Sequence, residues 1–307
     1  MLQRTIEKFE KNKVIELYCE SGYSLNQLEA IIGSCKKDIR LYLIAKGITI
    51  RGSQKDFTPR YNILSGNKSG KRFNDKVFEK IDNEEKAYWL GFFYADGYVL
   101  SNNYVAGICL QAKDVGHLHK FDRFVEATEN NVKYKPKLTK EKIFDLYQWV
   151  MHNENLYNSL IDKGCVPNKS LILTFPDEKI VPKKYVKDFI RGYFDGDGSV
   201  CLTNKTKEIS ILGTFDVLNG IKNSVDLFGK KNPTKPKNKR IYQLNLTGKR
   251  AFSFLQYIYK DATIYLDRKY QKYLEFCRLY EESYKLLGGK NEEDCDVNLV
   301  LTDKDFE

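Results

Sequence analysis

The sequence predicts an α+β protein in which one helix-and-strand unit occurs twice, behind a small all-α module. Residues 87–99 and 188–200 align without a gap, which places Asp96 over Asp197 at an offset of 101 residues. Both segments are followed by alternating and amphipathic stretches in the same order, a pattern typical of short antiparallel strands and surface helices. The 307 residues are 42% hydrophobic and 13% aromatic, enough to bury a sizeable core.

Composition excludes several other classes of protein. No apolar stretch approaches the ~18 residues of a membrane helix, and the charged N-terminus lacks the apolar run of a secretory signal. The seven cysteines form no Cys-x-x-Cys pair, so we expect reduced thiols in a cytoplasmic compartment and neither a disulfide framework nor a zinc site. The formal net charge of +10 favours a polyanionic partner. We expect no membrane partner and no small-molecule substrate.

Residues 1–51 are expected to form the all-α module. Helices are expected at 12–20 and 35–46, with a short helix between them that begins after the candidate N-cap Ser24. The apolar positions expected to face the core of this module are Leu25, Leu28, Ile32, Ile39, Leu43 and Ile44.

This order of helices, with a tight turn at Gly33-Ser34, resembles a helix-turn-helix domain. The resemblance implies that Lys36, Lys37 and Arg40 lie on the face available to a major groove. A three-helix module that binds another protein is the alternative. The basic, Gly/Ser-rich linker 52–83 is suited to follow DNA between this module and the rest of the chain.

The two copies of the repeated unit, 84–181 and 182–282, are each expected to run helix, strand, strand, helix, strand, strand, helix. An acidic tail, 283–307, follows them. The clearest predicted strands are 105–112 and 143–151 in the first copy, and 208–214 and 241–247 in the second.

Two basic runs occupy the same place in each copy. Residues 133–142 contain five lysines and one acidic residue, and residues 230–240 contain six basic residues and no acidic one. Their matching positions favour contact with the phosphates of a nucleic acid over two merely solvated loops. The predicted DNA contacts of the two copies are Lys113, Lys133, Lys135, Lys137, Lys230, Lys231, Lys235, Lys237, Lys239 and Arg240.

The aligned segments are predicted to be helices that pair with each other. Gly91 and Ala95 lie four residues apart on one face of the first helix, as Gly192 and Gly196 do on the second. Small residues at that spacing let two helices approach backbone to backbone.

An Asp-Gly pair ends each motif helix. We expect the glycine to close the helix in the left-handed conformation, which leaves Asp96 and Asp197 in the last turns. A carboxylate is unfavourable at a helix C-terminus, which already carries partial negative charge, and two such ends together would repel each other. A divalent cation, Mg²⁺ in the first place, is the simplest group that would offset this charge.

Residues 89–97 and 190–198 resemble the two motif copies that name the LAGLIDADG homing endonucleases. The resemblance covers about residues 84–282. It implies a single-chain, monomeric, pseudo-symmetric nuclease that presents a four-stranded antiparallel sheet to DNA from each copy. It also implies that Asp96 and Asp197 bind the catalytic metal at the scissile phosphates.

Two positions near the motifs have lesser roles in this interpretation. The earlier acidic position of the motif is Asp195 in the second copy but Tyr94 in the first. The resemblance implies that this position is not an essential metal ligand. Arg268 and Lys269 lie in 262–276, which resembles the closing helix of the family, and are expected to be structural or to contact a backbone.

The resemblance implies further groups around the metal. Gln111 matches a polar residue that organises water, with Lys113 beside it, and its expected counterpart in the second copy is Gly213. Lys249 matches the usual basic residue at the end of a fourth strand, with Arg250 as an adjacent alternative. The two half-sites are therefore expected to be chemically unequal.

The predicted function is site-specific cleavage of both strands of double-stranded DNA, with Mg²⁺ as cofactor and a long target site. The alternative is a binding protein on the same fold, either a maturase that assists splicing of an intron RNA or a regulator that binds DNA without cutting it. Retention of both motif aspartates favours the enzyme, because binding alone has no need of two carboxylates at negative helix ends. We expect the reading frame of a mobile element, free-standing or intron-encoded.

Overall fold

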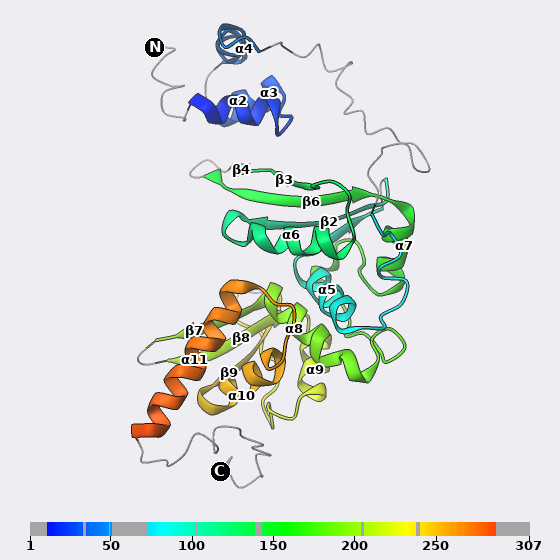
Figure 1. The fold of residues 1–307 in the computed structure, drawn as a ribbon, viewed down its shortest axis with the longest axis vertical. Helices are drawn as coiled ribbons and strands as arrows, with labels where there is room; N and C mark the ends of the chain where they lie inside the picture. The colour runs from blue at the N-terminus through cyan, green and yellow to red at the C-terminus, as the bar shows by residue number, and fades with distance from the viewer. Residues whose placement is uncertain are drawn as a thin grey trace. The chain divides into compact units, whose positions relative to one another are not determined.

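The structure is a computed structural model that describes residues 11–32, 35–48, 50, 73–101, 103–138, 143–203, 206–237 and 240–286. The chain divides into two compact units (Figure 1). Unit 1 contains the residues up to Ile81 together with Asp96–Lys169, and unit 2 contains Asp82–Ala95 together with the residues from Ser170 onward. The motif helix of the first copy therefore belongs to unit 2, where it packs against the motif helix of the second copy.

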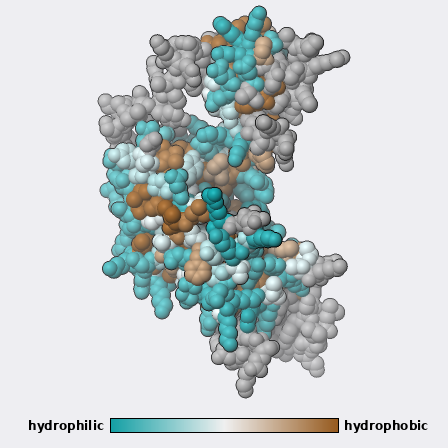
Figure 2. Space-filling model, turned by 180° about the vertical axis from the view of Figure 1, so that it is seen from behind, coloured by the Kyte–Doolittle hydropathy of each residue, from teal (hydrophilic) through white to brown (hydrophobic). Residues whose placement is uncertain are grey.

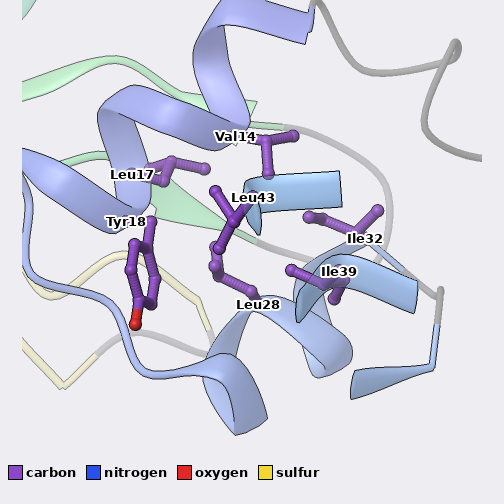
Figure 3. Close-up of a cluster of buried hydrophobic side chains, with 7 residues drawn as sticks. All are labelled: Val14, Leu17, Tyr18, Leu28, Ile32, Ile39 and Leu43. Atoms are coloured by element: carbon purple, nitrogen blue, oxygen red, sulfur yellow. The ribbon is translucent and has the colours of Figure 1, made fainter. Parts of the chain in front are cut away.

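Among the described residues of the N-terminal module there are three short helices, as expected: α2 (Lys11–Cys19), α3 (Leu25–Ile32) and α4 (Lys36–Ala45). Ser24 caps α3, because its Oγ accepts a hydrogen bond from the Gln27 amide at 3.2 Å while Gln27 Oε1 accepts from the Ser24 amide at 2.8 Å. Their shared core, drawn in Figure 3, consists of Val14, Leu17, Tyr18, Leu28, Ile32, Ile39 and Leu43.

One predicted core residue of the module is not in its core. Ile44 is 51% exposed, whereas Ile39 and Leu43 are fully buried. Residues 39 and 43 are four apart and share one face of α4, so the next residue points about 100° away from that face. The prediction that Ile44 faces inward was wrong for this reason. The turn residues Gly33 and Ser34 lie outside the described residues.

The main sheet of unit 1 is four-stranded and antiparallel. Its order is β1-β2-β6-β3, from β1 (Gly97–Leu100), β2 (Val105–Gln111), β6 (Leu146–His152) and β3 (Val132–Tyr134). A separate two-stranded ribbon pairs β4 (Lys137–Leu138) with β5 (Ile143–Phe144). The predicted strands at 105–112 and 143–151 are confirmed by β2, β5 and β6.

Helices cover one face of this sheet. The turn η1 (Ala112–Asp114) leads from β2 into α6 (Val115–Phe124), and α7 (Glu154–Asp162) follows β6. Trp149 and Phe121 are fully buried between sheet and helix with ring centroids 4.6 Å apart, and Trp149 Nε1 donates to Asp122 Oδ1 at 2.8 Å. Residues 73–81, at the end of the predicted linker, also pack in unit 1, with Phe78 fully buried; residues 51–72 lie outside the described part of the chain.

Unit 2 is built around α5 (Glu84–Ala95) and α8 (Val186–Asp197). Its sheet has the order β7-β8-β9, from β7 (Gly198–Leu202), β8 (Lys207–Gly213) and β9 (Tyr242–Thr247). The remaining elements are η2 (Lys169–Leu171), which straddles the boundary between the units, η3 (Lys183–Tyr185), α9 (Phe215–Ser224), α10 (Gly248–Tyr259) and α11 (Asp267–Leu286).

The sheet of the second copy differs from its prediction. Among the described residues it has three strands, and the place of the fourth is taken by an isolated bridge from Thr234 to Gln243. Pro233 and Pro236 lie on either side of the bridge, and proline has no N–H to donate to a sheet. The expected four-stranded sheet is therefore correct for the first copy and wrong for the second.

None of the helices in the described ranges is long and apolar enough to cross a membrane. The face of the molecule drawn in Figure 2 is largely hydrophilic, with small hydrophobic patches.

Candidate functional site at the ends of the motif helices

Two glycines let the motif helices cross at backbone distance. A Cβ built on Gly91 would lie 2.0 Å from the carbonyl oxygen of Phe189, and one built on Gly192 would lie 1.9 Å from the carbonyl oxygen of Tyr88. Any side chain at either position would push the helices apart. The predicted pairing of α5 with α8 is confirmed, and Ala95 and Gly196 lie partly exposed near the ends of the two helices.

Each motif helix leads directly into a strand. Asp197 is the last residue of α8 and is partly exposed, and Asp96 is the first residue after α5 and is exposed. Gly198 has φ −88° and ψ 161°, an extended conformation, and Gly97 is not among the residues with positive φ. The prediction of left-handed glycines was therefore wrong.

A close contact, rather than backbone conformation, accounts for glycine at position 198. A Cβ there would lie 2.5 Å from the carbonyl oxygen of Phe194 and 2.3 Å from its ring. The chain therefore needs glycine at this position to turn from α8 into β7 at once.

A buried lysine closes the C-terminus of α8. Lys269 of α11 is only 2% exposed, and its Nζ donates to the carbonyl oxygens of Phe194, Asp195 and Gly196 at 2.5, 2.7 and 3.2 Å. These contacts agree with the structural role that was one of the two alternatives expected for Lys269. An ammonium group at this position offsets the partial negative charge of the helix end, so the dipole of α8 does not by itself require a metal.

Asp195 has a structural role that the sequence did not reveal. It is fully buried, and its carboxylate accepts hydrogen bonds from the hydroxyls of Tyr88 (2.7 Å) and Tyr259 (2.5 Å) and from the amide of Leu266 (2.7 Å). Burial raises the pKa of Asp195, while the charge of Lys269 and these donors act in the opposite direction. The carboxylate joins α5, α8 and α10. Its three donors lie 64 to 107 residues away in the sequence, so no local signal pointed to them.

In unit 1, Asp96 lies in a charged neighbourhood centred on Cys109 of β2. Burial is the main cause of the raised pKa of the Cys109 thiol; the charges of Lys135 and Lys137 lower this pKa and the charge of Asp96 raises it. Two lysines of the first basic run therefore act on the same group as the motif aspartate. Gln111, the last residue of β2, is exposed, as is Lys113 in η1.

The strand registers correct the predicted counterpart of Gln111. Gly97 pairs with Ile108 in unit 1, and Gly198 pairs with Ile211 in unit 2, so the residue equivalent to Gln111 is Thr214 and not Gly213. The Thr214 hydroxyl donates to the carbonyl of Leu173 at 2.6 Å and caps α9. The residue at the end of this strand therefore has different chemistry in the two copies. Gln111 is an exposed amide in the first copy, and Thr214 caps a helix in the second.

Most of the other predicted site residues lie on the surface of their own elements. Lys249 and Arg250 are partly exposed in the first turn of α10. Lys239 lies outside the described residues. The exposed basic residues are Lys36, Lys37 and Arg40 on α4, Lys133, Lys135 and Lys137 in unit 1, and Lys230, Lys231, Lys235, Lys237 and Arg240 in unit 2.

The outer face of the unit 2 sheet carries a hollow of about 440 Å³ that sequence analysis did not identify. Alternate residues of the strands line the hollow, while the residues between them face the core. The hollow also reaches Pro236 of the second basic run. Gln243 Nε2 donates to Ser210 Oγ at 2.9 Å across this face. The residues that line the hollow are Ser199, Cys201, Glu208, Ser210, Leu212, Pro236, Ile241 and Gln243.

The donor set suits one kind of metal ion better than another. In the part of the chain that the structure describes, no group of three His, Cys, Asp or Glu side chains could hold a metal ion by itself. Mg²⁺ is commonly held by one or two carboxylates together with waters and substrate phosphates, so accessible aspartates at the helix ends fit it. They do not make the closed cage of a structural zinc site.

No protein-family model and no curated protein matches the sequence. Solved structures similar to the chain include the I-SmaMI LAGLIDADG homing endonuclease bound to cleaved DNA, at 12% identity over 67% of this chain and 92% of that one, with a TM-score of 0.44. The LAGLIDADG meganuclease I-AabMI bound to uncleaved DNA is 11% identical over 66% and 92% of the chains, with a TM-score of 0.39. The N-terminal LAGLIDADG domain of DUF199/WhiA is 15% identical over 60% and 89%, with a TM-score of 0.37.

Proposed function

We propose that the protein is a Mg²⁺-dependent endonuclease that cuts both strands of double-stranded DNA at a specific, long target site. The observation that carries the proposal is the glycine crossing of α5 and α8, with Gly91 and Gly192 each against a backbone carbonyl of the other helix. An aspartate stands at the end of each crossed helix, Asp96 after α5 and Asp197 within α8. A crossing this close holds α5 and α8 in one fixed relation, which supports a joint role for the aspartates that follow or end these helices.

Each residue of the site has a proposed role. The carboxylates of Asp96 and Asp197 would hold Mg²⁺, which when bound polarises the phosphoryl oxygen and promotes ionisation of the attacking water. Gln111 would orient that water by hydrogen bonding. Lys249 would place positive charge near the phosphate, whose oxygens become more negative in the transition state.

The exposed basic residues would bind the duplex. The lysines of the two basic runs would contact phosphates and supply affinity without sequence information, while the outer faces of the sheets would meet base edges. Lys36, Lys37 and Arg40 on α4 would add a separate contact in a major groove, as in a helix-turn-helix domain. We propose that a single chain, acting as a monomer, carries all of these surfaces.

One observation favours a second candidate, a nucleic-acid-binding protein that does not cut. Lys269 already offsets the negative end of α8, so the fold is stable there without a metal ion. A maturase acting on an intron RNA, or a DNA-binding regulator, would have this property.

The test is incubation of the protein with a plasmid that carries the two DNA flanks of its gene joined without the gene, in Mg²⁺ or in EDTA. We expect linear plasmid only in Mg²⁺. Asp96→Asn and Asp197→Asn should each abolish double-strand cleavage and leave DNA binding intact, because both lose a ligand charge without a change of shape.

The matched control is Asp162→Asn, which removes the same charge from an exposed position at the end of α7. It should cut like the wild type. Full cleavage by either motif variant would overturn the site, and binding without cleavage by the wild type, tested on both this DNA and the transcribed RNA, would favour the second candidate.

A further inference from the structure

The N-terminal module contacts the edge of the unit 1 sheet through the turn between α2 and α3. The Tyr23 hydroxyl donates a hydrogen bond to the carbonyl oxygen of Pro136 at 2.6 Å, and Ser21 Oγ donates to that of Tyr134 at 3.4 Å. The amide of Lys135, between these two acceptors, donates to β6. Backbone groups alternate in direction along an extended segment, so the two carbonyls face away from β6, at the free edge of the sheet.

The same part of the module stands over the outer face of the sheet. A hollow of about 490 Å³ lies between them, with β2, β6 and the first basic run as its second wall. The residues of the module that line it are Tyr23, Gln27 and Ile31. On the second wall, Cys109 and Gln148 are register partners, and the residues next to them, Ile108 and Trp149, are fully buried in the core. Cys109 and Gln148 therefore belong to the outer face.

This outer face is the one that is left for a ligand, because α6 and α7 pack on the other. A base edge that meets Cys109 or Gln148 must approach from the side on which the module stands. A cube of about 490 Å³ has edges of about 8 Å, whereas the major groove of a duplex alone is about 12 Å wide. The module and a duplex cannot occupy this face at the same time.

The module does not need the sheet in order to form its core. Its seven core residues all come from α2, α3 and α4 (Figure 3). The three module residues that line the hollow are uncharged, so they supply no negative charge to Lys135 and Lys137 on the opposite wall. A duplex would bring phosphates to these lysines, which the module does not replace.

The basic face of α4 lies outside this contact. Lys36, Lys37 and Arg40 are exposed, and none of them lines the hollow. DNA can therefore reach α4 while the turn between α2 and α3 still holds the sheet edge.

We propose that the N-terminal module is autoinhibitory: it occupies the DNA-binding face of unit 1 and leaves that face when a duplex binds. The inference rests on the proposed endonuclease function, which assigns this face to DNA. A covered face lowers the apparent affinity for DNA by the fraction of molecules in which the face is open. The hollow on the unit 2 sheet is lined by residues of unit 2, so the inhibition acts on one half of the target.

The variant that tests the proposal is Tyr23→Phe. It removes the hydroxyl that bonds to Pro136 and keeps the ring, which packs against the core of the module. The first measurement is binding of the full chain, in EDTA, to a duplex of the two gene flanks joined without the gene. We expect the Kd to fall about fivefold, because the loss of one hydrogen bond raises the open fraction by about that factor. Of two duplexes that each carry half of the junction, only one should show the change.

The second measurement needs no DNA. Cys109 lines the covered hollow and Cys201 lines the hollow of unit 2, so their rates of labelling by a maleimide, resolved by peptide mass mapping, report on the two faces separately. In Tyr23→Phe we expect Cys109 to label about fivefold faster than in the wild type and Cys201 at the same rate. Bound duplex should slow the labelling of Cys109 in the variant.

Tyr185→Phe is the matched control. It also removes a tyrosine hydroxyl that donates to a backbone carbonyl, but that carbonyl belongs to Asp82 in unit 2. It should leave the Kd for the duplex and the labelling rate of Cys109 unchanged. An unchanged melting temperature of Tyr23→Phe shows that the variant is folded.

The outcomes separate the two proposals. If Tyr23→Phe binds the duplex as the wild type does, or more weakly, the module does not inhibit and the autoinhibitory role is wrong, while cleavage by the wild type leaves the endonuclease in place. Unchanged labelling of Cys109 would also overturn the role, because the contact would not control access to the face. If neither the wild type nor Tyr23→Phe binds or cuts the duplex, the proposed function is wrong, and the autoinhibitory role with it.

Discussion

The two sides of the crossing between α5 and α8 use opposite chemistry on the same backbone contact. On one side the Tyr88 hydroxyl donates to the buried carboxylate of Asp195 at 2.7 Å. At the equivalent positions on the other side, the rings of Phe189 and Tyr94 meet edge to face, with centroids 5.0 Å apart. One side is a hydrogen-bonded network around a charge, and the other is an aromatic contact.

The two glycines define the crossing, and the side-chain contacts that flank them support it. The glycines are equivalent on both sides and meet carbonyl oxygens at 2.0 and 1.9 Å from their would-be Cβ positions. The flanking pairs differ completely, so the same backbone approach accommodates either kind of contact. The polar side adds a requirement of its own, because a buried carboxylate must keep all of its donors.

The largest expected effect comes from closing the crossing itself. Gly192→Ala places a methyl group against a backbone carbonyl that cannot move aside, so we expect the free energy of unfolding to fall by about 3 kcal/mol or more. Urea unfolding followed by circular dichroism measures it. Gly116→Ala is the control: this helical glycine of α6 has open space around its Cβ position, and alanine there should stabilise by about 0.5–1 kcal/mol. Equal stability of the two variants would contradict the geometry.

A smaller effect should distinguish the two sides of the crossing. Asp195→Asn replaces an acceptor oxygen by an NH₂ group among donors and removes the negative charge near Lys269, so we expect a loss of about 2–4 kcal/mol. Tyr94→Phe, at the equivalent position, keeps the ring contact and should cost no more than about 1 kcal/mol. Thermal unfolding of both variants is the measurement. A Tyr94→Phe variant at least as unstable as Asp195→Asn would show that the aromatic side is the dominant one.

The smallest effect concerns the strand ends that follow the motifs. Thr214 accepts a hydrogen bond from the Val217 amide at 3.2 Å, whereas Gln111, its counterpart, makes no side-chain cap in η1. Thr214→Ala should therefore cost about 1 kcal/mol of stability. Gln111→Ala should leave the unfolding free energy within about 0.5 kcal/mol, as expected for an exposed residue, while slowing cleavage if Gln111 orients water. Denaturant titration together with plasmid cleavage separates the two roles.

Sequence reasoning succeeded where the signal was local or repeated. The small residues of the motifs predicted a helix pair because such residues, four apart on one face, let two helices approach closely, and the alternating stretches predicted β2, β6, β8 and β9. It failed on Ile44 of α4, because the predicted core included this residue although it lies one position beyond the core face. The sequence did not predict that pairing here is limited to a single bridge at Thr234. Two prolines within a basic run do not indicate how many of the residues between them pair with a neighbouring strand.

The candidate site was harder to predict because its partners are distant in sequence. Asp195 is held by Tyr88 and Tyr259, which are 107 and 64 residues away. The carbonyl groups that Lys269 contacts belong to Phe194, Asp195 and Gly196, which precede it in the sequence by 75, 74 and 73 positions. Neither spacing repeats, so no periodicity could have revealed them.

The assignment of α5 to unit 2 has a consequence for synthesis. A ribosome completes residues 84–95 long before residues 186–197, so the emerging chain carries a helix whose glycine face has nothing to pack against. Native docking of that helix must wait until α8 has been translated, and during this interval the exposed face is open to chaperones or to another nascent chain. Fragments that stop before α8 should therefore aggregate, even though unit 1 holds a sheet and helices of its own.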